Sequence, residues 1–297
     1  MGKVLLYAGI FIIGFVGVSL FSFWLAVKPP KIQIPYTPEA FRLPAEAVTI
    51  ETTDGLKLAA WFIPRRGSVE VPRTSPGAND PALILLHGYP AEKADMLPIA
   101  AALHHDFATL LLDLRYFGKS QGRFTTLGLK ERDDLKRAID FLVRRGFTEV
   151  GVFGFSLGGA VGILTAAEDE RISAVAAYAP FSDLKKLGYE AYASLWILKY
   201  PLVRLMTLWA RLFFGGDITR PLPAEAAQEL SIPVFVIASR EDEQISFSHA
   251  ERLKLALAQN PDAEFYFLDR GRHGELPLDF EERLVEFFKK HLATPAS

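Results

Sequence analysis

The chain has 297 residues, half of them hydrophobic, which is enough to bury a sizeable core, and an α/β fold of this length is commonly one domain. Its formal net charge of −2 gives no electrostatic basis for binding nucleic acid, because such binding depends on concentrated Lys and Arg. The absence of cysteine excludes disulfides, thiolate zinc sites and cysteine nucleophiles. Catalytic chemistry must therefore come from Ser, His and carboxylate side chains.

The first segment differs from the rest in composition. The 24 residues from Val4 to Val27 carry no charge, and at about 1.5 Å per residue they are long enough to cross a hydrocarbon core of roughly 30 Å. A cleaved signal peptide would have a shorter apolar stretch and an A-x-A-like cleavage site, whereas Trp24 lies two residues before Ala26. We therefore expect an uncleaved, single-pass transmembrane anchor within residues 1–31.

Basic residues flank this span on both sides. Lys3 and the amino terminus precede it, and Lys28, Lys31 and Arg42 follow it. By the positive-inside rule this count weakly favours a cytoplasmic catalytic domain. Because basic residues occur on both sides, the count does not fix the side of the membrane.

A proline-rich segment follows the span. The four prolines between Pro29 and Pro38 predict a stiff, extended stalk that holds the folded part away from the bilayer. We expect the folded domain to occupy residues 45–292.

Short β-type runs alternate with helical patterns from Ala45 onwards. Asp54-Gly55 is a strong hairpin signal, so we expect the sheet to open with antiparallel strands at Val48–Thr53 and Leu56–Ile63. Parallel strands are expected at Ala82–Leu86, Ala108–Leu112, Val150–Phe153, Ile172–Tyr178, Pro233–Ala238 and Glu264–Leu268. Helices fill most of the intervals, and Arg65–Pro81 reads as a mobile connecting loop. This alternation predicts an α/β fold, a mostly parallel sheet with helices on both faces.

The segment FGFSLGG, Phe153 to Gly159, places a serine between an expected strand and an expected helix. A sharp strand-turn-helix holds such a serine in a strained conformation with its hydroxyl projecting. Gly154 and Gly158 fit this interpretation, because they remove side chains that would collide where the strand and the helix cross. We therefore predict that Ser156 is a nucleophile rather than a small residue in an ordinary turn.

A serine hydroxyl needs a base to remove its proton and a third group to orient that base. Of the six histidines, His273 lies in a short loop after the last expected strand, at the carboxyl edge of the sheet. Asp242 follows the strand Pro233–Ala238 at the same edge, and we predict that it is the acid. Its neighbour Glu241 is the alternative, because one residue of register would exchange them.

An oxyanion hole requires two backbone N–H groups aimed at the developing negative charge. One is expected from Leu157, directly after the nucleophile. The other is expected from Tyr89 in the loop His87-Gly88-Tyr89-Pro90, where the glycine allows close backbone approach. His87 itself is then expected to be structural.

Six motifs occur in order over roughly residues 45–291: HGYP, DLRYFGKSQG, GFSLGG, PFSDL, SREDEQI and GRHGE. Together they resemble the α/β-hydrolase superfamily, particularly its membrane-anchored serine hydrolases related to serine aminopeptidase and lysophospholipase-like domains. The resemblance implies an α/β-hydrolase fold, and a site made of Ser156 as nucleophile, Asp242 as acid, His273 as base, and Tyr89 and Leu157 as oxyanion donors. It implies structural roles for Asp113, Arg115, Ser120 and Asp183. One departure is Ser239, where the family often has glycine.

The expected function is that of a serine hydrolase, which cleaves an acyl ester or lipid through an acyl-enzyme intermediate and needs no metal or organic cofactor. A serine peptidase is the alternative, in which a carboxylate such as Glu92 or Asp95 would hold a substrate amine. A noncatalytic membrane scaffold with an inherited fold is a third reading. The oligomeric state is left open.

Residues 181–230 are expected to form a helical lid insertion. Its middle part, residues 194–216, carries apolar or aromatic side chains around almost the whole helical circumference. A helix covered in this way needs two apolar neighbours. One is the core, and the candidates for the other are an acyl chain, the bilayer and a partner subunit. The alternative is simple packing on the core with a break at Pro201. A lid that faces lipid predicts that Trp209→Ser or Phe213→Ser slows hydrolysis of long-chain esters selectively.

Overall fold

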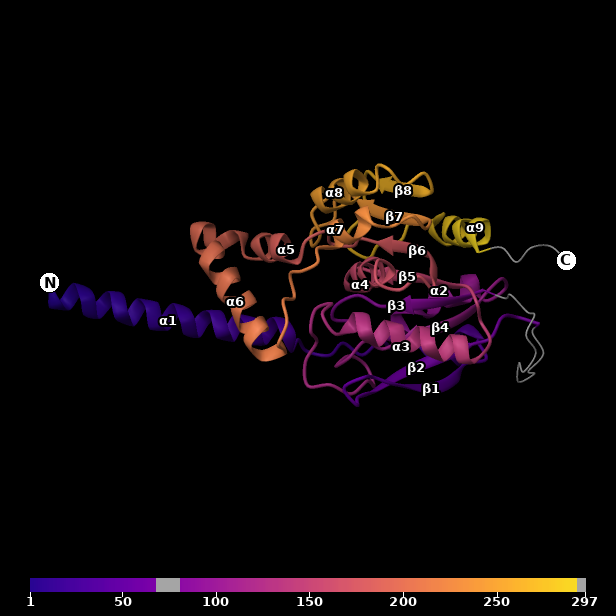
Figure 1. The fold of residues 1–297 in the computed structure, drawn as a ribbon, viewed down its shortest axis with the longest axis horizontal. Helices are drawn as coiled ribbons and strands as arrows, with labels where there is room; N and C mark the ends of the chain where they lie inside the picture. Colours follow the sequence, from indigo (N-terminus) through magenta and orange to yellow (C-terminus); the bar gives the residue numbers. More distant parts are fainter. Residues whose placement is uncertain (68–80, 293–297) are drawn as a thin grey trace.

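The structure is a computed structural model that describes residues 1–67 and 81–292 (Figure 1). Most of the loop expected at Arg65–Pro81 therefore lies outside the described residues. The described part contains an eight-stranded sheet in the order β1-β2-β4-β3-β5-β6-β7-β8. Within it, β2 is antiparallel to both its neighbours, and the other neighbouring strands are parallel. The predicted α/β-hydrolase fold, with its mostly parallel sheet, is confirmed.

The strands lie close to the expected positions. Their bounds are β1 Glu46–Glu51, β2 Lys57–Ile63, β3 Ala82–Leu86, β4 Ala108–Leu112, β5 Val150–Phe155, β6 Ile172–Tyr178, β7 Val234–Ser239 and β8 Ala263–Leu268. The α-helices are α1 Gly2–Val27, α2 Leu97–Leu103, α3 Glu131–Arg144, α4 Leu157–Ala166, α5 Leu184–Ala191, α6 Lys199–Phe214, α7 Pro223–Gln228, α8 Ser248–Ala256 and α9 Phe280–His291. The short 3-10 helices within the described residues are η1 Pro38–Phe41, η2 Lys93–Met96 and η3 Ala193–Leu198.

Helices cover both faces of the sheet. One core cluster joins the sheet to α3, α4, α7 and α8, and a second joins its other face to α2 and α9. Every residue of β3, β4 and β7 is buried, which explains why these strands appear in the sequence as continuous apolar runs rather than alternating ones. The carboxyl ends of the parallel strands meet at one edge, and the loops at that edge carry the candidate site.

The helix α1 projects from the α/β body, and α6 lies beside its C-terminal part (Figure 1). Among the described residues, α1 is the one helix long and apolar enough to cross a membrane. Its exposed side chains give way to buried ones at Ser19, Phe23 and Val27, where the helix meets the rest of the chain. We call α1, α5, η3 and α6 together the lid–anchor region.

The proline-rich segment is extended, but it does not hold the body away from the end of α1. The carbonyl oxygen of Pro29 accepts a hydrogen bond from the hydroxyl of Tyr116 at 2.5 Å, and the N–H of Ile34 donates to Glu92 Oε1 at 2.9 Å. The N–H of Thr125 donates to the carbonyl of Val27 at 2.9 Å. The expectation of a free stalk is wrong, because polar groups of the body hold the backbone that follows α1.

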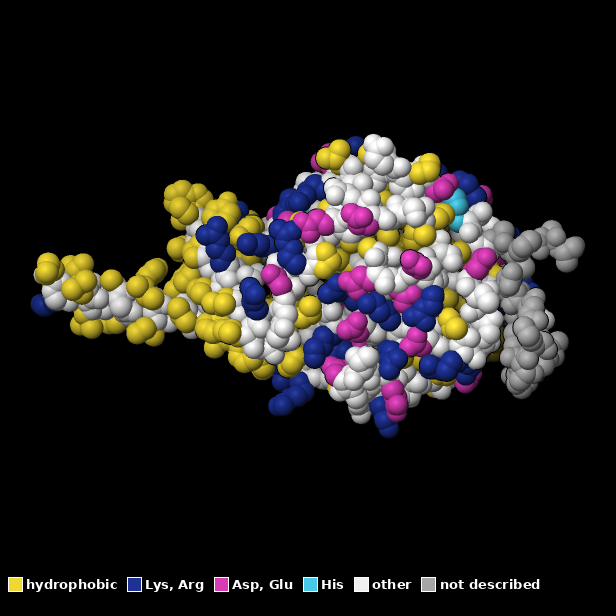
Figure 2. All heavy atoms as spheres, in the orientation of Figure 1, with side chains coloured by type: hydrophobic (Ala, Val, Ile, Leu, Met, Phe, Trp, Pro, Cys, Tyr) yellow, Lys and Arg dark blue, Asp and Glu magenta, His cyan; other side chains and the backbone are white. Residues whose placement is uncertain are grey.

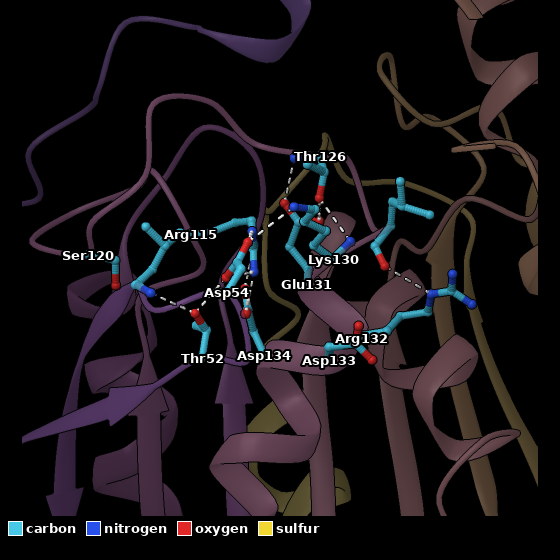
Figure 3. A network of polar contacts seen from close by, with 12 residues as sticks. Thr52, Asp54, Arg115, Ser120, Thr126, Lys130, Glu131, Arg132, Asp133 and Asp134 are labelled. Carbon is cyan, nitrogen blue, oxygen red and sulfur yellow. Dashed lines mark hydrogen bonds and ion pairs between the residues drawn. The ribbon is translucent and has the colours of Figure 1, made fainter. Parts of the chain in front are cut away.

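The loop between β4 and α3 makes that attachment rigid (Figure 3). Glu131 is fully buried at the start of α3 and accepts four hydrogen bonds at 2.5–2.9 Å, from the hydroxyls of Thr125 and Thr126 and from the N–H groups of Thr126 and Gly128. Arg115 in the same loop donates two hydrogen bonds to Asp134, at 2.6 and 2.7 Å. The turn that supports the end of α1 is thus fixed by buried, charge-assisted hydrogen bonds.

The insertion between β6 and β7 differs in detail from its expected form. Pro201 causes no break, because α6 begins only two residues earlier and proline is tolerated in a first helical turn. The kink lies instead in η3, where Trp196 has a φ of 48°. Gly215, at a φ of 72°, ends α6 in the left-handed conformation that glycine accepts readily.

Candidate active site

The strand-turn-helix around Ser156 has the geometry of a nucleophile elbow. Ser156 has φ 51° and ψ −110° between β5 and α4, a conformation that costs energy for a residue with a side chain. A Cβ atom added at Gly154 would lie 2.3 Å from the backbone of Gly158, so the crossing of strand and helix leaves no room for one. Side chains at Gly154 and Gly158 would therefore collide where the strand and the helix cross, as the sequence predicts.

His273 and Asp242 are brought together by the loops after β8 and β7. His273 Nδ1 lies 2.7 Å from Asp242 Oδ2, and both side chains are almost fully buried. The other oxygen of Asp242 accepts the N–H groups of Gln244 and Ile245, each at 2.8 Å. A carboxylate held in this way accepts the Nδ1 proton of the imidazole, which leaves Nε2 as the basic nitrogen.

The imidazole also lies next to the elbow. The ring of His273 packs against the ring of Phe155, the residue before Ser156, with the centroids 4.8 Å apart and the planes tilted by 34°. Glu241, the alternative acid, is exposed, and its N–H donates to Ser239 Oγ at 3.2 Å. The structure therefore places Asp242, and not Glu241, against the imidazole.

The loop after β3 lies against the elbow, because β3 and β5 are neighbours in the sheet. A Cβ atom at Gly88 would lie 2.6 Å from the Phe155 ring and 3.3 Å from Ser156 Cβ, so only glycine fits here. The next residue, Tyr89, can thus present its N–H close to the serine. Leu157 is the first residue of α4, where an N–H has no partner within the helix.

His87 holds this loop in place. Its Nδ1–H donates to the carbonyl of Gly88 at 2.8 Å, and its Nε2 accepts the N–H of Leu114 at 3.0 Å. Burial lowers the pKa of His87, which keeps the ring neutral and able to accept. The structural role expected for this histidine agrees with these contacts.

A cavity of about 570 Å³ opens in front of Ser156, with a mostly apolar lining. Its size is that of a typical small-molecule site. We call the sheet edge whose loops carry the candidate site the catalytic edge; it contributes Tyr89, Ser156, Leu157 and Asp242 to the lining. The helices α5 and α6 contribute much of the rest. The end of α1 also lines it, through Phe23 and Ala26.

A sequence model of the alpha/beta hydrolase fold matches residues 81–202. An esterase from Pyrococcus furiosus has a similar solved structure, at 28% identity and a TM-score of 0.70, over 90% of this chain and 99% of the esterase. The chain therefore has the α/β-hydrolase fold that this family model describes, and it is similar to a solved esterase over nearly its whole length.

The chain is also similar to a plant protein in sequence and to a bacterial peptidase in structure. The alpha/beta hydrolase domain-containing protein WAV2 of Arabidopsis thaliana is 26% identical over 80% of this chain and 75% of the plant protein. A puromycin-hydrolyzing peptidase of Mycobacterium tuberculosis superposes with a TM-score of 0.67, over 88% of this chain and 41% of the peptidase. At 17% identity the likeness to the peptidase shows the fold alone.

Sequence reasoning missed the part that α1 plays in the site. The hydroxyl of Tyr89 donates to the carbonyl of Ala26 at 3.1 Å, so the candidate oxyanion loop is bonded to the last turn of the apolar helix. Burial raises the pKa of Tyr89 to about 12, which keeps the phenol protonated as a donor. A signal that could have pointed there is the lack of charge up to Val27, but apolar composition does not say which face of a helix meets the body.

It also missed the contact that joins α5 to α8. His249 is fully buried, its Nδ1 accepts the N–H of Ser182 at 3.1 Å, and its Nε2–H donates to Glu190 at 3.0 Å. Glu190 lines the cavity. The neighbours of His249 in the sequence carry no sign of this contact, since its partners lie 59 and 67 residues away.

Proposed function

We propose that this hydrolase cleaves acyl esters with Ser156 as nucleophile, His273 as base, Asp242 as acid, and the N–H groups of Tyr89 and Leu157 as oxyanion donors. One observation carries the proposal: a buried imidazole–carboxylate pair at 2.7 Å stands beside a serine whose φ is 51°. Strained backbone and a buried His–Asp pair each have a cost, and their occurrence together at one sheet edge is explained by catalysis.

The steps follow from the geometry. Ser156 Oγ attacks the acyl carbon while His273 Nε2 takes its proton, and Asp242 stabilises the imidazolium that forms. The two N–H groups stabilise the negative charge on the carbonyl oxygen. The alcohol leaves with the proton from His273, and water then repeats the sequence to release the acid and free the serine.

The lining of the cavity favours an ester over an amide that carries a free amine. Glu92, one carboxylate considered for holding an amine, accepts the N–H of Ile34, and neither Glu92 nor Asp95 lines the cavity. The carboxylates of Glu190 and Glu243 do line it. Glu190 pairs with Lys186 and His249, and Glu243 pairs with Arg272. Relative rates on an acyl ester and an aminoacyl amide test this preference directly.

The proposal includes a membrane location. We propose that α1 is an uncleaved anchor, with residues 1–31 as the anchoring part and residues 45–292 as the hydrolase domain, including the lid at 181–230. Burial of Phe23 and Val27 against the rest of the chain supports retention of the helix, because cleavage after it would remove part of the fold. The count of basic residues favours a cytoplasmic domain.

The test is labelling of the full-length protein in detergent with a fluorescent fluorophosphonate, beside Ser156→Ala. We expect the label on the wild type and none on the variant. A folded wild type that takes no label would overturn the proposal and favour the scaffold reading. Residual label on Ser156→Ala would assign the reactive serine elsewhere.

A further inference from the structure

The lid and the anchor pack on each other through aromatic side chains. Phe23 of α1 stacks on Phe213 of α6 at 5.8 Å and contacts Phe214 at 5.7 Å. In addition, Trp209 Nε1 donates to Ser19 Oγ at 3.0 Å. The second apolar neighbour that α6 required is therefore α1, and Trp209 is a contact between the two helices.

The length of α1 limits where this contact lies in a bilayer. The apolar part between the charged Lys3 and the first buried residue, from Val4 to Val18, has 15 residues and is about 22 Å long at 1.5 Å per residue. A hydrocarbon core is roughly 30 Å thick. For α1 to span it, roughly one more turn must lie within the apolar layer, and that turn begins at Ser19, which is bonded to the lid.

The surface of the lid is apolar, as a position in contact with the bilayer requires. Hydrophobic side chains continue from α1 onto the neighbouring part of the lid, whereas charged side chains cover the α/β body (Figure 2). Trp196 is 81% exposed, Leu212 is 65% exposed and Phe213 is 55% exposed. The junction of α5 and α6 also lies on the side of the body from which α1 projects (Figure 1). Exposed aromatic residues at this position are typical of a membrane interface.

The cavity in front of Ser156 lies between α1 and α6. Phe23 and Ala26 form its wall on the α1 side, Val203 and Met206 form its wall on the α6 side, and Ser156 lies at its catalytic edge. A mostly apolar cavity of about 570 Å³ between a membrane helix and a nucleophile suits a hydrocarbon chain.

We propose that the lid is embedded in the membrane interface around the end of α1, and that the cavity which α1 and α6 enclose takes one acyl chain of an ester lipid from the same bilayer. This rests on the proposed function for the reaction itself, and it adds the substrate class and a specificity role for the anchor. The anchor then does more than retain the enzyme at the membrane, because its last turn is a wall of the acyl site.

The first test is a pair of variants in full-length protein reconstituted in phosphatidylcholine vesicles. Ala26→Trp fills the cavity from the α1 side, while Leu25→Trp adds the same side chain at a position that is 53% exposed and outside the lining. The readout is the ratio of kcat/KM for monooleoylglycerol carried in the vesicles to that for p-nitrophenyl acetate. We expect Ala26→Trp to lower this ratio by about tenfold, because the acyl chain would lose the contacts of a few methylene groups. We expect Leu25→Trp to leave the ratio unchanged.

Two results would overturn the acyl-site assignment. An unchanged ratio in Ala26→Trp would place the chain elsewhere, and equal losses on both esters would mean that residue 26 acts on the catalytic edge. Met206→Trp provides the same test from the α6 wall if Ala26→Trp does not fold. A wild type that takes no fluorophosphonate label would refute the proposed function, which is a separate failure.

The second test does not depend on catalysis. Brominated phosphatidylcholine quenches tryptophans that lie in the bilayer, and Trp196→Phe removes the exposed tryptophan of η3. We expect brominated lipid to quench less fluorescence intensity in Trp196→Phe than in the wild type, because the variant lacks a tryptophan that lies in the bilayer. Equal loss of intensity in the wild type and in Trp196→Phe would place the lid outside the membrane and overturn its embedding.

Discussion

The catalytic edge of the sheet and the lid–anchor region are held together by different interactions. At the catalytic edge, buried strands present loops whose backbone and side chains are tied by hydrogen bonds, as at Asp242, which accepts three of them. In the lid–anchor region, aromatic contacts around Phe23 dominate, and many apolar side chains remain exposed. The first region suits chemistry that needs fixed geometry, and the second suits an apolar substrate and surroundings.

Two polar joints connect these regions. Glu131 fixes the turn whose Thr125 N–H bonds the end of α1, and His249 links α5 to α8 through Glu190. The comparison therefore predicts that changes at the edge alter catalysis, whereas changes at the joints alter stability.

The largest expected effect is at the catalytic edge. Asp242→Asn should lower kcat by about 10³- to 10⁴-fold, because an amide stabilises the wrong tautomer of His273 and does not balance the imidazolium charge. The matched control is Glu241→Gln, which should stay within about twofold of the wild type since this side chain is exposed. Steady-state hydrolysis of p-nitrophenyl butyrate measures both. A large loss in Glu241→Gln with little change in Asp242→Asn would identify Glu241 as the acid instead.

The second effect is at the joint below α1. Glu131→Gln should lower the free energy of unfolding by about 3 kcal/mol, because an amide NH₂ then faces buried donors that the carboxylate had satisfied. Asp133→Asn, in the same helical turn and with a side chain that is 55% exposed, should change it by less than about 0.5 kcal/mol. Denaturant unfolding in detergent micelles measures both. Similar values for the two variants would show that the turn is not a joint.

The smallest effect is a pH dependence at the joint between α5 and α8. Burial lowers the pKa of His249 below its ordinary 6.5, so the folded state holds this ring neutral while the unfolded state gains a proton as the pH falls. Its contribution to stability is therefore complete above about pH 6.5 and is lost as the pH falls towards the folded pKa.

The measurement compares His249→Gln with the wild type between pH 7 and pH 5. The unfolding free energy of His249→Gln should fall less steeply with decreasing pH than that of the wild type. The two slopes should differ by at most about 1.4 kcal/mol per pH unit, which is the slope that one titrating group produces. His87, whose pKa burial also lowers, supplies slope that remains in both proteins. Identical pH profiles of the unfolding free energy in the two proteins would contradict the assignment to His249.

Much of the fold could be predicted because its strands are short, buried and flanked by turn residues. The run Ala82–Leu86 has the predicted bounds, and so does Ile172–Tyr178. The site prediction for Ser156, Asp242 and His273 placed residues on loops at one sheet edge, and the structure brings His273 to Asp242 there. Whether these residues catalyse hydrolysis stays a prediction.

The failures share a cause. The stalk was predicted from proline content, but the contact of Pro29 with Tyr116 joins residues 87 positions apart. The sequence allows an acyl chain, the bilayer or another subunit as the second neighbour of α6, but the structure places α1 there. The hydrogen bond between Trp209 and Ser19 joins residues 190 positions apart. Local pattern carries no information about such pairings.

The sequence by itself determined the α/β class, the apolar helix and the residues that catalysis would need, because hydrophobic periodicity, turn chemistry and reactive side chains are local properties. Only the tertiary structure decided that the end of α1 is a wall of the cavity in front of Ser156. The physical reason is that an apolar helix packs equally well against lipid or protein, so its neighbours are set by how the whole chain closes around them.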